Sequence, residues 1–300
     1  METNIVTREE VVERSAELPA FPRIVSEIIA TLDDPEANFK VLVDHIAHDT
    51  VIAARVLSLA NVASGHSRRQ SSVSDIYTAT SMIGTGRVRE MAIISSIGGF
   101  VDGVAAGGLS DAFWQHSVAV GVCSEELARH TALPGSAGAA LIAGLLHDVG
   151  QLWLYRFNPE MFRMAWRDAL SSATGIEAVE HEHFGADHSI IGAWLAEHWA
   201  LPAGIVAAIQ HHHCPDDALM EPLVPLVHVA EVLSNALDLT ERDENRVTSL
   251  SPAACRRLGL AIDTDIQSLF GRMEARSRHA NALFQRASQI QPASCSHTEQ

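Results

Sequence analysis

Histidine and carboxylate residues are the part of this sequence whose types and spacing could do chemistry. The adjacent residues His147 and Asp148 stand in the stretch LLHDVGQL, where an apolar run ends at a glycine. One turn of helix can present an imidazole and a carboxylate to the same ion, which suits a first-row transition metal or a mixed dinuclear site. Further candidate ligands stand on separate predicted helices, as a site in the core of a helical bundle requires. They are His116, His188, the run of His211, His212 and His213, and Glu231.

The same residues have simpler interpretations. His147 and Asp148 could form a buried polar contact in which the carboxylate holds the imidazole without any ion. The run of three histidines could be a solvated helix end, where cationic side chains suit the helix dipole, and three consecutive residues cannot all face one ion. Surface or hydrogen-bonded core positions are expected for His130, His181, His183, His198 and His228.

Other catalytic motifs are absent from the sequence. It contains no GxSxG, no GxxxxGK[ST], no GxGxxG after a strand and no HExxH. A thiol enzyme is disfavoured because a nucleophilic cysteine needs an oriented base. The cysteines show no CxxC pair, so they predict neither a disulfide framework nor a zinc ribbon, and a reducing compartment fits them best. They are Cys123, Cys214, Cys255 and Cys295.

Charge narrows the class of ligand. The 300 residues include 37 acidic and 21 basic ones, a net charge of −16, which argues against a nucleic-acid backbone or an anionic membrane as the main ligand. Residues 111–240 carry 16 acidic and 4 basic residues (−12), together with 11 of the 16 histidines. Because acidic residues and imidazoles coincide in this segment, metal binding is the interaction to test.

Composition and periodicity predict a mostly helical protein. Hydrophobic residues make up 47% of the chain and aromatic residues only 5%, a mixture that favours helix packing over aromatic-rich strands. Apolar residues recur at helical spacing, and no stretch alternates with a period of two. The helix expected over residues 137–157 contains His147 and Asp148 near its centre, so we expect a buried helix and not a membrane span. The other helices expected in the second half cover residues 112–132, 159–173, 175–183, 188–199, 202–212 and 223–239.

Glycines and charge also suggest the domain boundaries. The stretch DGVAAGGLS predicts a linker at residues 102–110 between two lobes, 13–101 and 111–240. We expect an N-terminal tail at residues 1–12, a helical extension at 241–287, with Ser251 as the cap of its first helix, and a disordered tail at 288–300. Four arginines of the extension could dock onto the acidic middle segment, although a solvated helix is the more ordinary interpretation. They are Arg272, Arg276, Arg278 and Arg286.

Seven short blocks, taken in order, resemble the bacterial HDOD family, the HD-related output domain of signal transduction. The blocks are LPAFP (18–22), IAHDTVIAARVLSLAN (46–61), DIYTATSMIG (75–84), FWQHSVAVG (113–121), LLHDVGQL (145–152), DHSIIGAWLAEHWALP (187–202) and AIQHHHCP (208–215). The resemblance covers residues 13–240 and implies an all-α, two-lobed helical bundle, with an N-terminal helical lobe and an HD-like lobe at residues 111–240.

The HDOD family belongs to the wider HD metal-phosphohydrolase superfamily, so the resemblance also implies a metal site. The residues that stand where catalytic relatives hold metal are His116, His147, Asp148, His188, His212 and Glu231, with His213 as an additional candidate ligand. The resemblance implies one or two divalent ions of iron, manganese or zinc. Many relatives of the output family have lost part of this set, so a chain without metal is the alternative.

Several positions depart from the pattern of catalytic relatives. Members that cleave cyclic dinucleotides resemble HDxGK, whereas this chain has Gln151 in place of the lysine, so a cation near the substrate phosphate is missing. No GYP follows the paired histidines, and Glu231 replaces the usual aspartate. Two further positions differ from the output-domain pattern: Thr50 replaces the proline after Asp49, and Val62 replaces the serine after Asn61. These two changes concern local loop geometry.

Two functions are compatible with these residues. The first is a cytoplasmic, non-catalytic signalling module without catalytic residues, which acts on a regulatory protein partner supplied in trans and binds neither nucleic acid nor membrane. Its docking face would be the N-terminal lobe with the polar loop at residues 64–72, and a homo-oligomer is compatible with it. The second is a metal-dependent phosphohydrolase or phosphodiesterase acting on a nucleotide or cyclic dinucleotide. The missing lysine and GYP favour the first.

Overall fold

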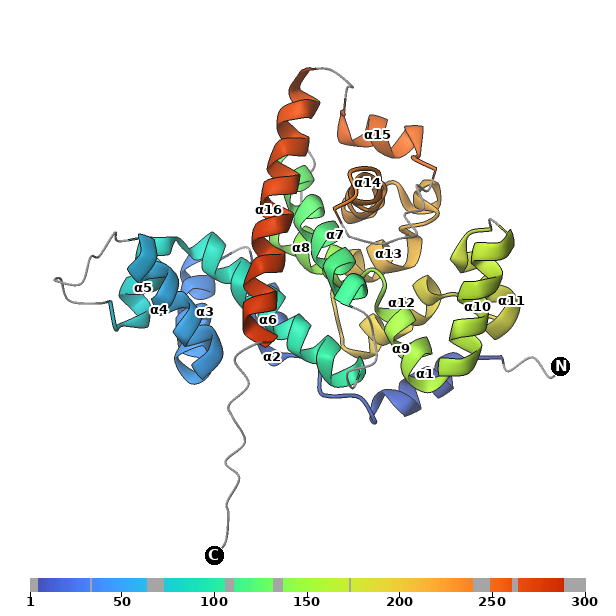
Figure 1. Cartoon of the computed structure of the whole chain (residues 1–300), viewed down its shortest axis with the longest axis horizontal. Coiled ribbons are helices and arrows are strands. Elements are labelled where there is room, and N and C mark those ends of the chain that lie inside the picture. The colour runs from blue at the N-terminus through green and yellow to red at the C-terminus, as the bar shows by residue number, and fades with distance from the viewer. Residues whose placement is uncertain are drawn as a thin grey trace, which may run out of the picture.

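The computed structural model describes residues 5–32, 34–63, 73–105, 111–131, 137–172, 174–239, 249–260 and 264–288, and in these ranges the chain is all-helical with no strand (Figure 1). This confirms the predicted all-α fold. The first half contains α1 (Arg8–Ser15), α2 (Arg23–Ala30), α3 (Pro35–His48), α4 (Thr50–Ala63), α5 (Ile76–Ile83) and α6 (Thr85–Ala105). The second half contains α7 (Asp111–His130), α8 (Ala137–Leu146), α9 (Val149–Phe157), α10 (Pro159–Ser172), α11 (Ile176–Phe184), α12 (His188–His198), α13 (Ala203–His211), the 3₁₀ helix η1 (Pro215–Ala218), α14 (Leu223–Ala236), α15 (Pro252–Leu258) and α16 (Thr264–Ser288).

Side-chain caps fix where several helices begin. Asp34 accepts from the backbone N–H groups of Glu36 and Ala37 at 3.1 and 3.0 Å and so starts α3. Ser251 accepts from the N–H of Ala254 at 3.1 Å, and Pro252 is the first residue of α15. A capping oxygen replaces a bond that the first turn of a helix cannot make internally. The predicted cap at Ser251 is confirmed.

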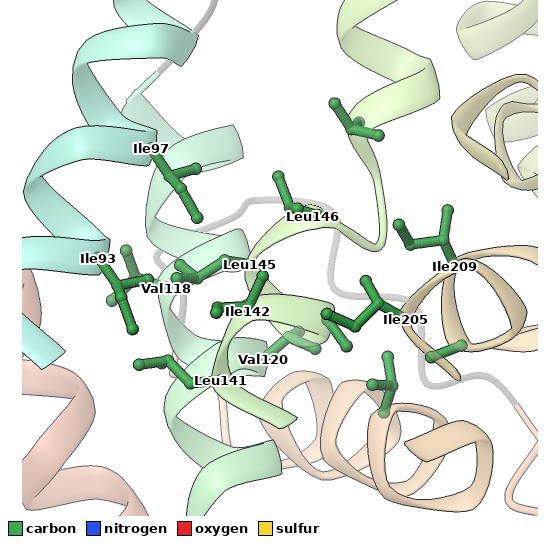
Figure 2. Packing of buried hydrophobic residues seen from close by; sticks show 14 of the residues in the cluster. Ile93, Ile97, Val118, Val120, Leu141, Ile142, Leu145, Leu146, Ile205 and Ile209 are labelled. Atoms are coloured by element: carbon green, nitrogen blue, oxygen red, sulfur yellow. The ribbon is translucent and has the colours of Figure 1, made fainter. Parts of the chain in front are cut away.

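Helix α6 connects the two halves of the chain. It packs against α2 to α5 on one side and against α7, α8 and α9 on the other. Figure 2 shows Ile93 and Ile97 of α6 facing Val118 of α7 and Leu141 and Leu145 of α8. The buried apolar residues of both halves form one continuous cluster. Among the described residues no break in this core marks a boundary, so the division into two lobes stays a prediction.

The linker predicted at residues 102–110 is wrong in its first part. Helix α6 continues to Ala105, with Val101 and Val104 buried. Gly103 serves a close approach, because a Cβ there would lie 2.9 Å from Cγ of Pro19. The rest of the segment, 106–110, lies outside the described residues, as do the polar loop at 64–72, Cys295 and, apart from its first residue, the tail at 288–300.

The N-terminal tail predicted at residues 1–12 is also wrong for the part that the structure describes. Helix α1 begins at Arg8 and packs against α12 of the second half. Val6 and Val11 are buried, and the N–H of Val6 donates to the carbonyl of Phe184 at 2.8 Å. This segment therefore closes over helices that come much later in the sequence.

The single helix predicted over residues 137–157 is interrupted. Helix α8 ends at Leu146, α9 begins at Val149, and His147 and Asp148 form the turn between them. By length and composition alone, this stretch could cross a membrane, but 89% of its apolar window is buried inside the protein. The sequence predicts that this stretch is buried, and the structure places it in the core of the protein.

The C-terminal extension does not form a solvated helix, which corrects the more ordinary interpretation of its arginines. Helix α16 lies against α6 and α7 (Figure 1). Arg272 and Arg276 of α16 contact Glu126, and Arg276 also contacts Glu125. Arg278 pairs only with Glu274 of its own helix among the described residues. Arg272 and Arg276 thus dock on the acidic middle segment, whereas the side chain of Arg286 lies outside the described part of the chain.

Candidate metal centre

The turn between α8 and α9 places His147 and Asp148 inside the protein. Their exposed fractions are 0% and 4%. Asp148 occupies the cap position of α9, but its side chain makes no capping bond. Its carboxylate is therefore directed to other groups, and these are imidazole rings from four separate segments of the chain.

Asp148 lies at the centre of the candidate site. Its Oδ2 atom is 3.4 Å from Nε2 of His147 and 3.8 Å from Nε2 of His116. Its Oδ1 atom is 3.4 Å from Nε2 of His188 and 3.8 Å from Nε2 of His212. Each carboxylate oxygen thus faces its own pair of ring nitrogens.

The potential ligand atoms form two groups, within each of which all atoms lie within 4.8 Å of one another. The first contains Asp148, His188, His212 and His213, and the second contains His116, His147 and Glu231. Imidazole nitrogen combined with carboxylate oxygen is a donor set that suits first-row transition metals. The donors therefore fit the metal site that the sequence predicts.

Backbone carbonyls orient two of the rings. Nδ1 of His147 lies 2.7 Å from the carbonyl of Gly144, and Nδ1 of His212 lies 2.7 Å from the carbonyl of Ile209. Because a carbonyl oxygen can only accept, each Nδ1 must carry the hydrogen. In a neutral ring, the lone pair is then on Nε2, the atom that faces Asp148. This is the arrangement by which proteins prepare histidines for metal binding.

His188 is oriented by a buried carboxylate. Asp187 caps α12 by accepting from the N–H groups of Ser189 and Ile190, so His188 is the first residue of that helix. Glu180 of α11 accepts from the backbone N–H of His188 at 2.9 Å and from its Nδ1 at 2.5 Å. Glu180 is fully buried. Glu180 was not among the residues predicted from the sequence.

The charges in the centre depend on one another. Burial alone would raise the pKa of Asp148, but His147, His188, His116 and His212 outweigh it and lower that pKa. Burial also opposes the charged form of His188, yet Glu180 and Asp148 raise the pKa of this ring to about 10. Burial lowers the pKa values of His212 and His213 well below the usual range. These shifts favour the ionised form of Asp148 and the protonated form of His188, and they disfavour the charged forms of His212 and His213.

A network on the far side of His212 holds its backbone. Nδ1 of His228 donates to the carbonyl of His212 at 2.7 Å, and Nε2 of His228 accepts from the N–H of Ser251 at 3.0 Å. The Ser251 hydroxyl donates to Asp216 at 2.6 Å. His228 is thus a hydrogen-bonded core residue, as expected, and it ties the C-terminal extension to the loop that follows α13.

Close helix packing brings the ligands together. A Cβ at Gly150 of α9 would lie 2.0 Å from the carbonyl oxygen of His188 in α12, and one at Gly144 of α8 would lie 2.7 Å from Cα of Gly121 in α7. Only glycine permits such contacts. The first contact sets Asp148 beside His188, and the second sets His147 near His116.

The structure gathers seven of the candidate ligands in two groups that meet at Asp148: His116, His147, Asp148, His188, His212, His213 and Glu231. His211 belongs to neither ligand group, in line with the expectation that three consecutive histidines cannot all face one ion. His130 and His183 contact surface partners, Arg272 and Asp168 respectively. Glu180 was missed because Glu177, Glu180 and Glu182 look alike in the sequence of α11. Only the placement of α12 distinguishes them.

Comparisons with known proteins agree with this fold. The sequence model of the HDOD domain family matches residues 18–215. An uncharacterised protein of Treponema pallidum (strain Nichols) is 24% identical over 231 residues, which cover 76% of this chain and 44% of that protein. The chain therefore spans less than half the length of this relative.

Two solved structures resemble the chain over nearly its whole length. An HDOD domain protein of unknown function from Geobacter sulfurreducens gives a TM-score of 0.71 at 24% identity and covers 93% of this chain and 98% of that one. A protein from Shewanella amazonensis SB2B gives a TM-score of 0.65 at 25% identity, and the match covers 94% of this chain and 98% of that one. The name of that protein assigns it a phosphohydrolase activity by inference only.

Proposed function

This chain belongs to the HDOD domain family, and from that premise we propose that it is a cytoplasmic signal-transduction output module that holds a divalent transition metal and acts on a regulatory protein in trans. In this proposal the metal centre is a structural or signal-sensing element, and the readout is a protein interaction. The chain carries out no turnover of its own. The proposal is supported by the enclosure of the centre, the surroundings of Asp148 and the family.

Enclosure of the centre is the observation that carries the proposal. His147, His188 and His212 are 0% exposed. His116, Asp148 and Glu231 are 2%, 4% and 5% exposed. Structural metal sites are closed by protein ligands, whereas catalytic sites keep a position open for water or substrate. These six ligands are buried and His213 is partly exposed, and a centre with six buried ligands favours an ion that stabilises or reports a state of the fold.

The surroundings of the centre also disfavour an anionic substrate. Gln151, which stands in place of a lysine, is a buried residue of α9 that is 4% exposed. The basic residues between positions 111 and 239 that the structure describes are all exposed arginines: Arg129, Arg156, Arg163 and Arg167. Charge developing on a phosphate must be neutralised by cations or metal ions. None of these four arginines is placed at the centre, so no described lysine or arginine of this segment supplies such a cation there.

The ligand set indicates what an ion would do. Iron, manganese or zinc would be held by Asp148 and its four histidines, and His213 and Glu231 would complete the shell. The free energy of binding the ion would stabilise the folded state, because the unfolded chain has no such site. Asp148 joins the two ligand groups, Glu180 and the backbone carbonyls keep the rings oriented, and His228 holds the His212 backbone. Metal occupancy would therefore be felt in α7, α12, α13 and α14 together.

The test combines loading with two readouts. Protein with confirmed iron, manganese or zinc content is assayed against a panel of nucleotides and cyclic dinucleotides, and is also used as bait in a pull-down beside Asp148→Ala protein. We expect no turnover above the Asp148→Ala background, and a specific partner retained by the loaded chain. Metal-dependent turnover that the variant loses would contradict the proposal, as would a pull-down without any specific partner.

A metal-dependent phosphohydrolase is the second candidate, and one observation favours it. The two oxygens of Asp148 face separate ligand groups, which is the arrangement that a pair of ions with a bridging carboxylate would use. The named activity of the Shewanella amazonensis protein points the same way. This function would require the ligand shell to open, and the substrate panel above decides between the two.

A further inference from the structure

Helix α16 covers a surface of the domain without belonging to the segment that defines the family. The family match ends at residue 215, whereas α16 spans Thr264–Ser288. In Figure 1, α16 runs as a long red helix across α6 and α7, and it packs against both. The surface beneath α16, formed by α6 and α7, is called the α6–α7 surface below.

A narrow stripe of α16 is buried on this surface. The stripe consists of Leu269, Met273, Ser277 and Ala280, each 2% exposed or less. Their spacing places them on one side of a helix. Two of the four are small, and the Ser277 hydroxyl, although 1% exposed, makes no hydrogen bond among the described residues. A buried polar group without a partner is unfavourable, so α16 fits this surface imperfectly.

Arginine contacts provide the rest of the attachment. Arg276 lies 3.0 Å from Glu90 of α6 and 2.9 Å from Glu126 of α7, and it also donates to Glu125. Arg272 donates to Glu126 at 2.7 Å and lies 2.7 Å from Nε2 of His130. Arg272 and Arg276 are therefore anchored by carboxylates from two helices, one in each half of the chain.

The α6–α7 surface requires cations from whatever covers it. The Glu125 side chain is 0% exposed. Burial and the neighbouring Glu90 raise the pKa of Glu125, and Arg276 and Arg129 oppose this effect. If α16 left, Glu90, Glu125 and Glu126 would face one another, and Arg129 would remain on Glu125. Such a surface is stable when another guanidinium replaces Arg276.

We propose that the α6–α7 surface is the docking site for an amphipathic, arginine-bearing helix of a protein partner, and that α16 is its internal occupant. This inference rests on the proposed function, because it names the surface through which the module acts. The partner helix presents two arginines four residues apart to Glu90, Glu125 and Glu126. It also presents an apolar side chain where α16 has Ser277, so it binds better than the resident helix.

The test measures whether the surface accepts a helix in trans. The probe is a fluorescently labelled peptide of residues 264–288 with Ser277→Ala, and its binding to full-length protein is followed by fluorescence anisotropy. The test protein carries Arg272→Gln and Arg276→Gln, which release α16. The matched control carries Arg278→Gln, because Arg278 is on the same helix but pairs only with Glu274 among the described residues.

We expect the double variant to bind the peptide at least about tenfold more tightly than the wild-type or Arg278→Gln protein. A probe that itself carries Arg276→Gln should lose this binding. If the double variant folds poorly by circular dichroism, Arg272→Gln alone serves, since the Arg272 side chain is 40% exposed; we expect it to give a smaller gain in the same direction.

Two results would overturn the inference. One is a folded variant in which hydrogen exchange shows that α16 is released, but which binds the peptide no better than the control. The other is a released variant that dimerises by exchanging α16 between copies, which would make a second chain the occupant. Because neither readout uses the metal or the natural partner, failure here leaves the metal proposal and its pull-down test standing.

Discussion

Glu180 accepts two hydrogen bonds from His188, one from the backbone N–H at 2.9 Å and one from ring Nδ1 at 2.5 Å. The first bond fixes the start of α12, and the second fixes the ring. Both partners are fully buried. The Nε2 atom of His188 is thereby directed toward Asp148 and His213, at 3.4 and 2.9 Å. A carboxylate outside the ligand set thus determines the orientation of a ligand.

Replacing Glu180 by glutamine should weaken metal binding. The amide retains much of the shape but loses the charge that holds His188, and the loss of such a supporting carboxylate typically costs about 10–100-fold in metal affinity. Competition with a chromophoric chelator measures the effect. Glu182→Gln is the control, because Glu182 is an exposed residue of the same helix. Equal affinities in the two variants would show that Glu180 does not position His188.

Replacing Gly150 by alanine should destabilise the protein by about 1–3 kcal/mol or more, as overpacking does. The new Cβ would lie 2.0 Å from the His188 carbonyl oxygen and 2.8 Å from the Gly192 nitrogen, and both are backbone atoms. Urea unfolding measures the loss. Gly99→Ala is the control, because a Cβ placed at Gly99 would meet no neighbouring atom within 4 Å. Alanine is also a better helix former than glycine. A harmless Gly150→Ala would contradict the close contact of α9 and α12.

An aromatic group connects the first half of the chain to the second. Phe21 stacks on Trp199 with a centroid distance of 4.7 Å, and Phe100 meets Trp199 edge-on at 5.4 Å. A double-mutant cycle with Phe21→Leu and Trp199→Leu should give a coupling free energy of about 0.5–1.5 kcal/mol. Additive effects on unfolding would show that Phe21 and Trp199 are not coupled.

Replacing Asp148 by alanine should lower the free energy of unfolding by about 1–3 kcal/mol in metal-free protein, because it leaves the buried His188 ring, whose charged form Asp148 favours, without one of its carboxylate partners. The loss should be larger in metal-loaded protein. Asp168→Ala is the control: its side chain is 58% exposed and pairs with His183 on the surface, so an effect within about 0.5 kcal/mol is expected. An unchanged melting temperature for Asp148→Ala would indicate that this carboxylate is idle.

The sequence places the candidate ligands on separate helical segments because each segment has its own apolar periodicity, and the structure brings their side chains close together. Their role as metal ligands stays a prediction. The break at His147 and Asp148 could not be predicted in the same way. The apolar pattern continues across it, and the turn is held by contacts of Asp148 with His116, His188 and His212, which are distant in the sequence. Local periodicity does not record such contacts.

The docking of α16 illustrates the same limit. Arg276 and its partner Glu126 are separated by 150 residues, so composition shows opposite charges but not which of them meet. The pairing depends on the packing of Leu269 and Met273 against α6 and α7. A solvated helix and a docked helix have the same local sequence properties, and tertiary packing distinguishes them.

The most direct test of the account is the metal content of the chain. Protein purified without a histidine tag is compared by elemental analysis with a His147→Ala, Asp148→Ala double variant. We predict about one to two equivalents of iron, manganese or zinc in the native chain, and their loss in the variant. A native chain that is well folded and free of metal, even after incubation with each ion, would contradict it.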